Sequence, residues 1–237
     1  MNENSALDLK SLLRLAHSNG LGDGFLPFWA GMLSEVLAPI GPTSRVLEFG
    51  ATNPKFLRFV QLAYPFRTGL GVVLDVDAIE GYETWTTAGE MSCRFISESS
   101  LVSESGLFDS AFSHELFSLL PDLSVHANVA WRLLAPGGTY YAAFGWHGTN
   151  PYISRQAKLR ADRNLPFHPY QLDTVAETFH AVGFEVGYKR LTMPYFMMYD
   201  PRLVKRRFGG VTEMIECLQD HKILFSFRKE SSAHGET

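Results

Sequence analysis

Two segments carry residues that could bind a nucleoside at the ends of strands. The apolar run RVLEFG ends in Glu48 and Gly50, and glycine accepts backbone conformations closed to other residues and lets a ligand approach the main chain. The run GVVLDVD contains Asp75, 25 residues after Gly50. In nucleoside-binding α/β folds, an acidic residue at the end of the second strand accepts hydrogen bonds from the ribose hydroxyls. Asp77 is the fallback for this role. The alternatives are an ordinary tight turn between strand and helix at Gly50, and an aspartate that only caps the following helix.

These residues need parallel strands to bring them to one edge of a sheet. From residue 45 onward, short apolar runs alternate with helical stretches, which is typical of β-α-β units. Strands are predicted at residues 45–49, 69–75, 93–97, 107–113 and 139–145, followed by two late strands at 184–191 and 222–227. The segment Pro136-Gly137-Gly138 is predicted to end a helix and to turn the chain into the fifth strand.

The remaining pattern predicts helices and the division of the chain. Helical spacing is found at residues 7–16, 25–37, 123–135, 154–163, 170–181 and 211–218, and a further helix can begin at Pro54. We expect residues 1–40 to form a helical addition or lid and residues 41–230 to form the main domain. Insertions are expected near 145–167 and 193–210, and a disordered tail at 231–237.

Four segments in succession resemble motifs one, two, four and five of the class I S-adenosylmethionine-dependent methyltransferases. They are VLEFG, VVLDVD, FDSAFSHELFSLLPD and WRLLAPGGTYYAAF, and together they span residues 45–144. The R-L-L-x-P-G-G stretch is the most specific part, and the late strand pair fits the terminal antiparallel hairpin of this family. The resemblance implies an α/β three-layer sandwich with a seven-stranded, mostly parallel sheet whose last strand is antiparallel, with an N-terminal helical addition.

The same resemblance implies S-adenosylmethionine as the cofactor and S-adenosylhomocysteine as the product. Glu48 and Gly50 would lie beside the methionine portion, and Asp75 would hold the ribose. Three residues after the third strand would flank the adenine, namely Ser97, Glu98 and Ser99.

The glycine loop departs from the family pattern. The family's first motif reads acidic-x-Gly-x-Gly-x-Gly, whereas this chain has a single glycine, Gly50, followed by Ala51-Thr52-Asn53. The Thr52 hydroxyl could satisfy the cofactor carboxylate, and a shifted or lost cofactor pose is the alternative. A Rossmann dehydrogenase is disfavoured, because its glycine fingerprint is absent and it leaves the Pro-Gly-Gly element unexplained.

His114 and His147 are the predicted catalytic residues. Methyl transfer from a sulfonium is an in-line displacement, so the protein has to align the acceptor and remove a proton from it where needed. His114 follows the fourth strand and His147 lies just beyond the fifth, and histidine titrates near neutral pH. Either could be a general base, or an ordinary surface or hydrogen-bonding residue. By the resemblance, Ser113 and His114 would border the cofactor near its sulfonium.

Aromatic and methionine-rich segments in the two insertions predict a lid over the methyl acceptor. The residues expected to bind the acceptor are Trp146, Tyr152, His168 and Tyr195. An apolar pocket with a few polar groups suits a small organic molecule, although a secondary core beneath long loops is the alternative. Lys205-Arg206-Arg207 could attract an anionic acceptor or form a solvated face.

Charge and composition restrict the class of partner. The formal net charge is -4, so the field of the whole molecule disfavours nucleic acid. Cys93 and Cys217 show no C-x-x-C spacing, and no metal-ligand spacing is recognisable. The start of the chain lacks a signal-like apolar stretch, and no run reaches the roughly 18 apolar residues of a spanning helix. We therefore expect a cytoplasmic protein without a membrane partner or a metal, and a homodimer remains open.

The interpretation that follows is methylation of an oxygen or nitrogen of a small metabolite. One alternative is a catalytically degenerate domain that binds a nucleoside or a partner, which the altered glycine loop motivates. A second alternative is methylation of a protein or peptide, for which a wide cleft would be evidence.

Overall fold

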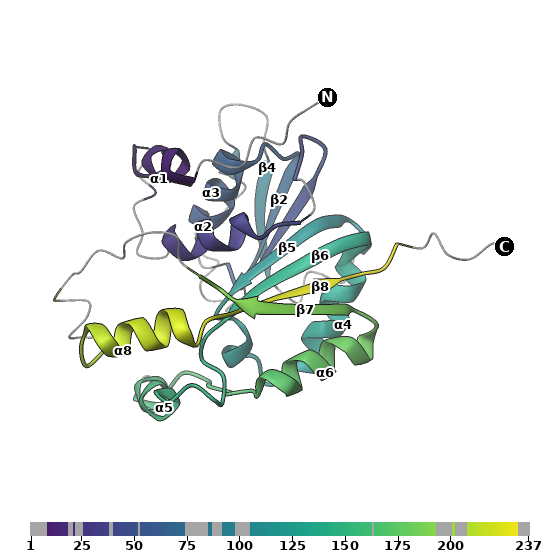
Figure 1. Ribbon diagram of the computed structural model, residues 1–237. Helices are drawn as coiled ribbons and strands as arrows, with labels where there is room; N and C mark the ends of the chain where they lie inside the picture. The colour runs from purple at the N-terminus through teal and green to yellow at the C-terminus, as the bar shows by residue number, and fades with distance from the viewer. Residues whose placement is uncertain are drawn as a thin grey trace.

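A single mixed β-sheet forms the centre of the protein, with helices on both of its faces (Figure 1). The structure, a computed structural model, describes residues 9–18, 21, 26–37, 40–51, 53–73, 85–86, 92–97, 105–162, 164–192, 201 and 208–231. All statements below concern these residues.

The sheet has the strand order β3-β4-β2-β1-β5-β6-β8-β7 in the described part of the chain. The strands are β1 (Arg45–Phe49), β2 (Thr68–Val73), β3 (Trp85–Thr86), β4 (Ser92–Ser97), β5 (Phe108–His114), β6 (Leu134–Phe144), β7 (Glu185–Arg190) and β8 (Ile223–Arg228). Strands β4, β2, β1, β5 and β6 are parallel, and β8 runs antiparallel between β6 and β7. The seven longer strands confirm the predicted sheet, and the two-residue β3 is an antiparallel addition at its edge.

The helices form the two outer layers. They are α1 (Leu9–Ser18), α2 (Leu26–Ser34), α3 (Lys55–Ala63), α4 (Leu123–Leu133), α5 (Ile153–Ala161), α6 (Leu172–Val182) and α8 (Val211–Ile215), which continues as a π-helical turn, Glu216–Asp220, with a short 3-10 turn at Phe117–Leu119. Helices α1, α2 and α3 cover one face and α4 and α6 the other, whereas α5 and α8 lie beyond the end of the sheet (Figure 1).

Alternation along the strands divides the core into two layers. Successive side chains of a strand point to opposite faces, so Val46 packs with α1, α2 and α3 while Leu47 packs with α4 and α6. The α4 side is rich in aromatic rings, and the centroids of Phe179 and Phe227 lie 3.7 Å apart. Because both layers are apolar, the ends of the strands are where polar groups can gather.

The boundary between α4 and β6 differs from the prediction. Helix α4 ends at Leu133 and β6 begins directly at Leu134, so Pro136-Gly137-Gly138 lies inside the strand and not in a turn before it. The prediction was wrong here because pairing with β5 extends the strand across a bulge, at which Phe108 pairs with Leu134 and Ser110 with Thr139. A Cβ at Gly138 would lie 2.8 Å from the Phe108 carbonyl oxygen, so only glycine fits this bulge.

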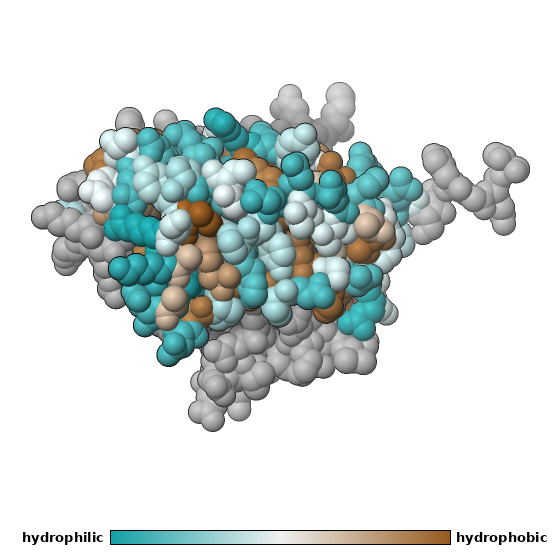
Figure 2. Space-filling model, turned by 90° about the horizontal axis from the view of Figure 1, so that it is seen from below, coloured by the Kyte–Doolittle hydropathy of each residue, from teal (hydrophilic) through white to brown (hydrophobic). Residues whose placement is uncertain are grey.

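The face that α5 and α6 present to solvent is mainly hydrophilic, with apolar residues interspersed in small groups (Figure 2). Val125 and Leu165 are among the larger apolar side chains exposed on the protein. No helix within the described ranges has both the length and the apolar character that crossing a membrane requires.

Candidate functional site

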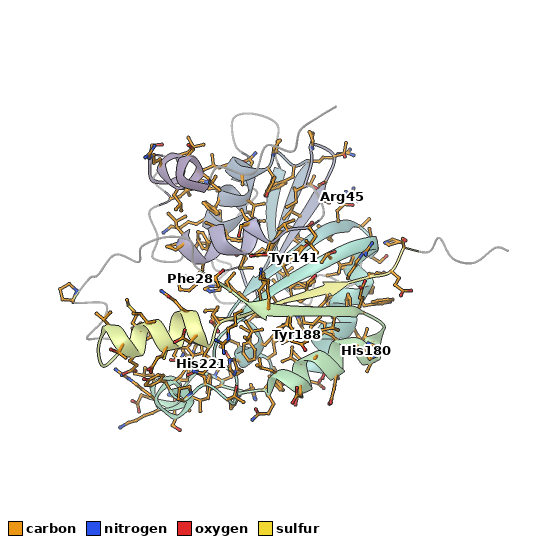
Figure 3. The ribbon with its side chains drawn as sticks, in the orientation of Figure 1. Phe28, Arg45, Tyr141, His180, Tyr188 and His221 are labelled. Atoms are coloured by element: carbon orange, nitrogen blue, oxygen red, sulfur yellow. The ribbon has the colours of Figure 1, made fainter. Side chains whose placement is uncertain are left out.

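Polar side chains from distant parts of the chain meet at the carboxyl ends of the parallel strands. Phe49 of β1 pairs with Ser113 of β5, and His114 of β5 pairs with Ala143 of β6, so the residues that follow these strands share one edge. Figure 3 shows Phe28 of α2 and His221, which follows α8, at this same end of the sheet. In open α/β sheets this edge is the usual place for a ligand.

Glu48 and Gly50 lie at this edge as the sequence predicts. The Oε2 atom of Glu48 is buried and has no hydrogen-bond partner among the described residues, and burial raises the pKa of Glu48 to about 8. Gly50 has a φ of 73°, and a Cβ at this position would lie 2.9 Å from Leu116 Cδ1. The loop after β1 therefore combines an unsatisfied acidic group with a backbone position that favours glycine.

Glu115 and Lys222 form a buried ion pair that the sequence analysis missed. The Lys222 side chain is only 2% exposed, and Glu115 Oε2 accepts hydrogen bonds from the amides of Gly145 and Trp146 at 3.1 and 3.3 Å. Burial alone would raise the pKa of Glu115, but Lys222, His114 and the hydrogen bonds lower it below its ordinary value. Glu115 also has a φ of 57°, which is uncommon outside glycine.

His114 lies against this ion pair. Its Nε2 atom is 3.4 Å from Lys222 Nζ, and its ring centroid is 5.5 Å from that of Phe28. The Lys222 ammonium also lies 4.9 Å from the centre of the Phe28 ring. Burial, and then the charge of Lys222, lower the pKa of His114 to about 3, so the imidazole is neutral near pH 7.

His147 is held by hydrogen bonds on both ring nitrogens. Its Nε2 lies 2.8 Å from the carbonyl oxygen of His221, and its Nδ1 lies 2.6 Å from Thr149 Oγ1. The residue is 2% exposed, and burial lowers its pKa. A catalytic role for His147 stays a prediction, and these contacts favour a structural role in joining the loop after β6 to the start of β8.

Ser113 directs its hydroxyl toward α4. The hydroxyls of Ser113 and Tyr140 share a hydrogen bond of 2.6 Å, and the Tyr140 hydroxyl lies 3.1 Å from His126 Nε2. Burial lowers the pKa of His126 to about 3. The predicted contact of Ser113 with a cofactor stays a prediction, because this hydroxyl already has a partner in the core.

Trp146 and Tyr152 belong to a small apolar cluster between the loop after β6 and α8. Both pack against the buried residues Phe208, Met214 and Cys217. The Tyr152 hydroxyl donates to Glu216, which raises the pKa of Tyr152 to about 12.

A salt bridge and the His168 segment add to the structure around this cluster. Arg155 of α5 and Glu213 of α8 form a salt bridge of 2.5 Å. The ring of His168 stacks on Tyr170 and its amide donates to the Ser118 carbonyl at 2.7 Å. The role of Trp146, Tyr152 and His168 toward an acceptor stays a prediction.

Several predicted site residues lie outside the described residues. They are Thr52, Asp75, Asp77, Glu98, Ser99, Tyr195 and Lys205-Arg206-Arg207, together with the side chain of Ser97.

The order β4-β2-β1-β5-β6-β8-β7, with β8 antiparallel, is that of the class I S-adenosylmethionine-dependent methyltransferase fold. No family model matches the sequence, and no curated protein matches it. Solved structures do match in fold. The chain of a candidate methyltransferase, solved in complex with the Haloferax volcanii Trm112 methyltransferase activator, is 15% identical with a TM-score of 0.72, over 94% of this chain and 98% of that one.

Two other similar structures are methyltransferases of different kinds. An S-adenosylmethionine-dependent methyltransferase from Mesorhizobium loti is 14% identical, with a TM-score of 0.61, over 88% of this chain and 99% of that one. Geranyl diphosphate C-methyltransferase from Streptomyces coelicolor is 14% identical, with a TM-score of 0.63, over 92% and 91%. At these identities the similarity establishes the fold.

Proposed function

We propose that this protein is an S-adenosylmethionine-dependent methyltransferase that acts on an oxygen or nitrogen of a small metabolite. The observation that carries the proposal is the buried Oε2 of Glu48, which has no hydrogen-bond partner among the described residues, beside Gly50 at the carboxyl edge of a class I methyltransferase sheet. A buried polar group without a partner is costly, and a bound ligand with a hydrogen-bond donor would satisfy it.

We assign the contacts with the cofactor to residues that follow the parallel strands. Glu48 and the loop at Gly50 would lie beside its methionine portion, and Asp75 would hold the ribose, with Ser97 and Glu98 beside the adenine. When bound, S-adenosylmethionine supplies a methyl group on a sulfonium that an acceptor atom can displace.

The acceptor side is formed by Phe28 and His114, with the Glu115–Lys222 pair behind them. Phe28 is 2% exposed and its ring is tilted by 31° against that of His114, so this side excludes water and orients an acceptor by apolar and hydrogen-bonding contacts. Since Lys222 is already neutralised by Glu115, it offers no free charge to an anionic acceptor. A small, partly apolar acceptor fits this environment.

The helical addition predicted at residues 1–40 also belongs to the proposed site. Helices α1 and α2 pack with α3 on the same face of the sheet, and α2 delivers Phe28 to the site. We therefore propose that this addition covers the acceptor side. Separately, we propose that the protein acts in the cytoplasm.

Calorimetric titration with S-adenosylmethionine and S-adenosylhomocysteine tests the proposal. We expect micromolar binding of both ligands by the intact protein, and binding weakened at least tenfold in Asp75→Ala because the ribose loses its carboxylate partner. The matched control is Asp173→Ala in the first turn of α6, which should bind as the unaltered protein does. Absence of binding by the intact protein would contradict the proposal and favour the catalytically degenerate domain.

A further inference from the structure

The Glu115–Lys222 ion pair holds the turn that follows β6. Glu115 Oε2 accepts hydrogen bonds from the amides of Gly145 and Trp146 at 3.1 and 3.3 Å, and Glu115 Oε1 accepts from the Lys222 ammonium. We propose that Glu115 and Lys222 are positioning residues that hold Trp146 as one wall of the site for the methyl acceptor. This role rests on the proposed function and deepens it, because it names the residues that shape the acceptor side.

Glu115 has a backbone conformation that is rare for glutamate. Its φ is 57°, in the left-handed region. The other non-glycine residue with a positive φ in the described ranges is Asn164, and asparagine tolerates this region because its short side chain can bond locally. Strained residues persist where the surrounding structure fixes them, and they gather at functional sites. The contacts of Glu115 with Lys222 and with two amides hold it in this conformation.

Gly145 shows how closely the ion pair approaches the turn. A Cβ at Gly145 would lie 2.8 Å from Glu115 Oε1 and 3.2 Å from Lys222 Nζ, closer than atoms pack without strain. The register of the sheet produces this approach, because Phe144 pairs with Ile223 and Gly145 therefore lies opposite Lys222. A side chain at position 145 would separate the pair or displace the turn.

Asn150 holds the same turn through its carbonyl group. Asn150 is 1% exposed, its Nδ2 donates to the Gly145 carbonyl at 2.8 Å, and its Oδ1 accepts from the Tyr152 amide at 2.9 Å. Glu115 binds the N–H of Gly145 and Asn150 binds its C=O, so buried side chains satisfy both groups. A fully satisfied polar network of this kind makes the backbone rigid. The turn thus gives Trp146 and Tyr152 a fixed backbone.

The ion pair also contacts the helical addition. The Lys222 ammonium lies 4.9 Å from the centre of the Phe28 ring of α2, within the range of a cation–π contact. One buried pair therefore touches Phe28 and, through the turn, the backbone of Trp146. In-line methyl transfer depends on the alignment of the acceptor, so a small displacement of the wall would slow it.

Two double variants that differ in one side chain test the role of Glu115. Glu115→Gln with Lys222→Met and Glu115→Leu with Lys222→Met both remove the two charges, so neither leaves a single charge buried. Glutamine keeps an oxygen that accepts from the amides of Gly145 and Trp146, whereas leucine has none. We expect amide hydrogen exchange at these two positions to be about tenfold faster in the leucine double variant than in the glutamine one.

Fluorescence quenching by acrylamide follows the ring of Trp146. The difference between a protein and its Trp146→Phe counterpart isolates this ring from the other tryptophans. Quenching of Trp146 should increase in the leucine double variant and stay at the value of the unaltered protein in the glutamine one. Equal exchange and equal quenching in the two double variants would overturn the positioning role, because the turn would then not depend on the acceptor oxygen at position 115.

Gly145→Ala disturbs the same contact with both charges in place, and it serves if the double variants do not fold. Gly145 is not among the glycines with a positive φ, so the backbone allows alanine and the collision with Glu115 and Lys222 opposes it. We expect faster exchange of the Trp146 amide. The matched control is Gly187→Ala in β7, where a Cβ would come no closer than 3.7 Å to Ser226. Unchanged exchange in Gly145→Ala would contradict the proposal.

Calorimetry with S-adenosylhomocysteine separates this role from the proposed function. The affinity of the folded leucine double variant should stay within about twofold of that of the unaltered protein, because the ion pair acts on the acceptor side. A larger loss of affinity would overturn the assignment of the pair to that side. Failure of the unaltered protein to bind S-adenosylhomocysteine would instead overturn the proposed function, whereas the exchange rates decide whether Glu115 holds the turn.

Discussion

The buried carboxyl of Glu48 makes the stability of the ligand-free protein depend on pH. Burial raises its pKa from the ordinary value of 4.5 to about 8, so between these values the folded state holds a proton that the unfolded state has lost. Stability from this group is therefore fully present below pH 4.5 and is lost as the pH rises toward 8. One pKa unit corresponds to about 1.4 kcal/mol, and the loss between pH 5 and pH 8 is about 3 kcal/mol.

Urea unfolding at a series of pH values measures this loss. Glu48→Gln cannot ionise, so the difference in unfolding free energy between the unaltered protein and the variant isolates the contribution of the carboxyl. We expect that difference to move by about 3 kcal/mol in favour of the variant as the pH is raised from 5 to 8. Glu185→Gln, on the exposed side of β7, is the matched control and should show no such trend.

A difference that stays constant across this pH range would contradict a raised pKa of Glu48. It would mean that Glu48 is solvated or paired in the folded protein, and that its Oε2 does not await a ligand.

Three further substitutions test the structure around the site. Gly50→Ala should cost about 1–2 kcal/mol for the left-handed conformation, lowering Tm by about 2–8 °C and weakening S-adenosylmethionine binding; unchanged thermal melting would contradict this. Phe227→Ala should cost about 3–5 kcal/mol in urea unfolding, because the ring is fully buried and stacked on Phe179. Arg155→Met should change stability by no more than about 1 kcal/mol, since the arginine is 39% exposed. Its loss of contact with Glu213 should still speed amide hydrogen exchange in α5, and exchange in α5 at the original rate would argue against the link.

Local pattern was sufficient to predict most of the fold. The run of apolar residues at 45–49 coincides with β1, and the predicted strands at 107–113, 184–191 and 222–227 match β5, β7 and β8 to within one or two residues. These elements can be predicted because side-chain periodicity and the alternation of strand and helix depend on residues that are neighbours in the sequence. The same pattern placed Glu48, Gly50 and His114 at the carboxyl ends of strands, where the structure has them.

The boundary between α4 and β6, near Pro136-Gly137-Gly138, could not be predicted in this way. The residues have the composition of a turn, but the pairing of β6 with β5 draws them into the strand. Pairing between strands is a tertiary interaction, and it overrides the local preference of a few residues.

Contacts between distant segments bring the residues of the candidate site together. Glu115 and Lys222 are 107 positions apart, and neither stands in a motif or a spacing that predicts an ion pair. They meet because β6 pairs in parallel with β5 and antiparallel with β8, which sets the ends of three strands side by side. Local sequence is enough to predict where strands such as β1 and β5 end. The register of the sheet sets which of those ends touch, because register depends on contacts between segments far apart in the chain.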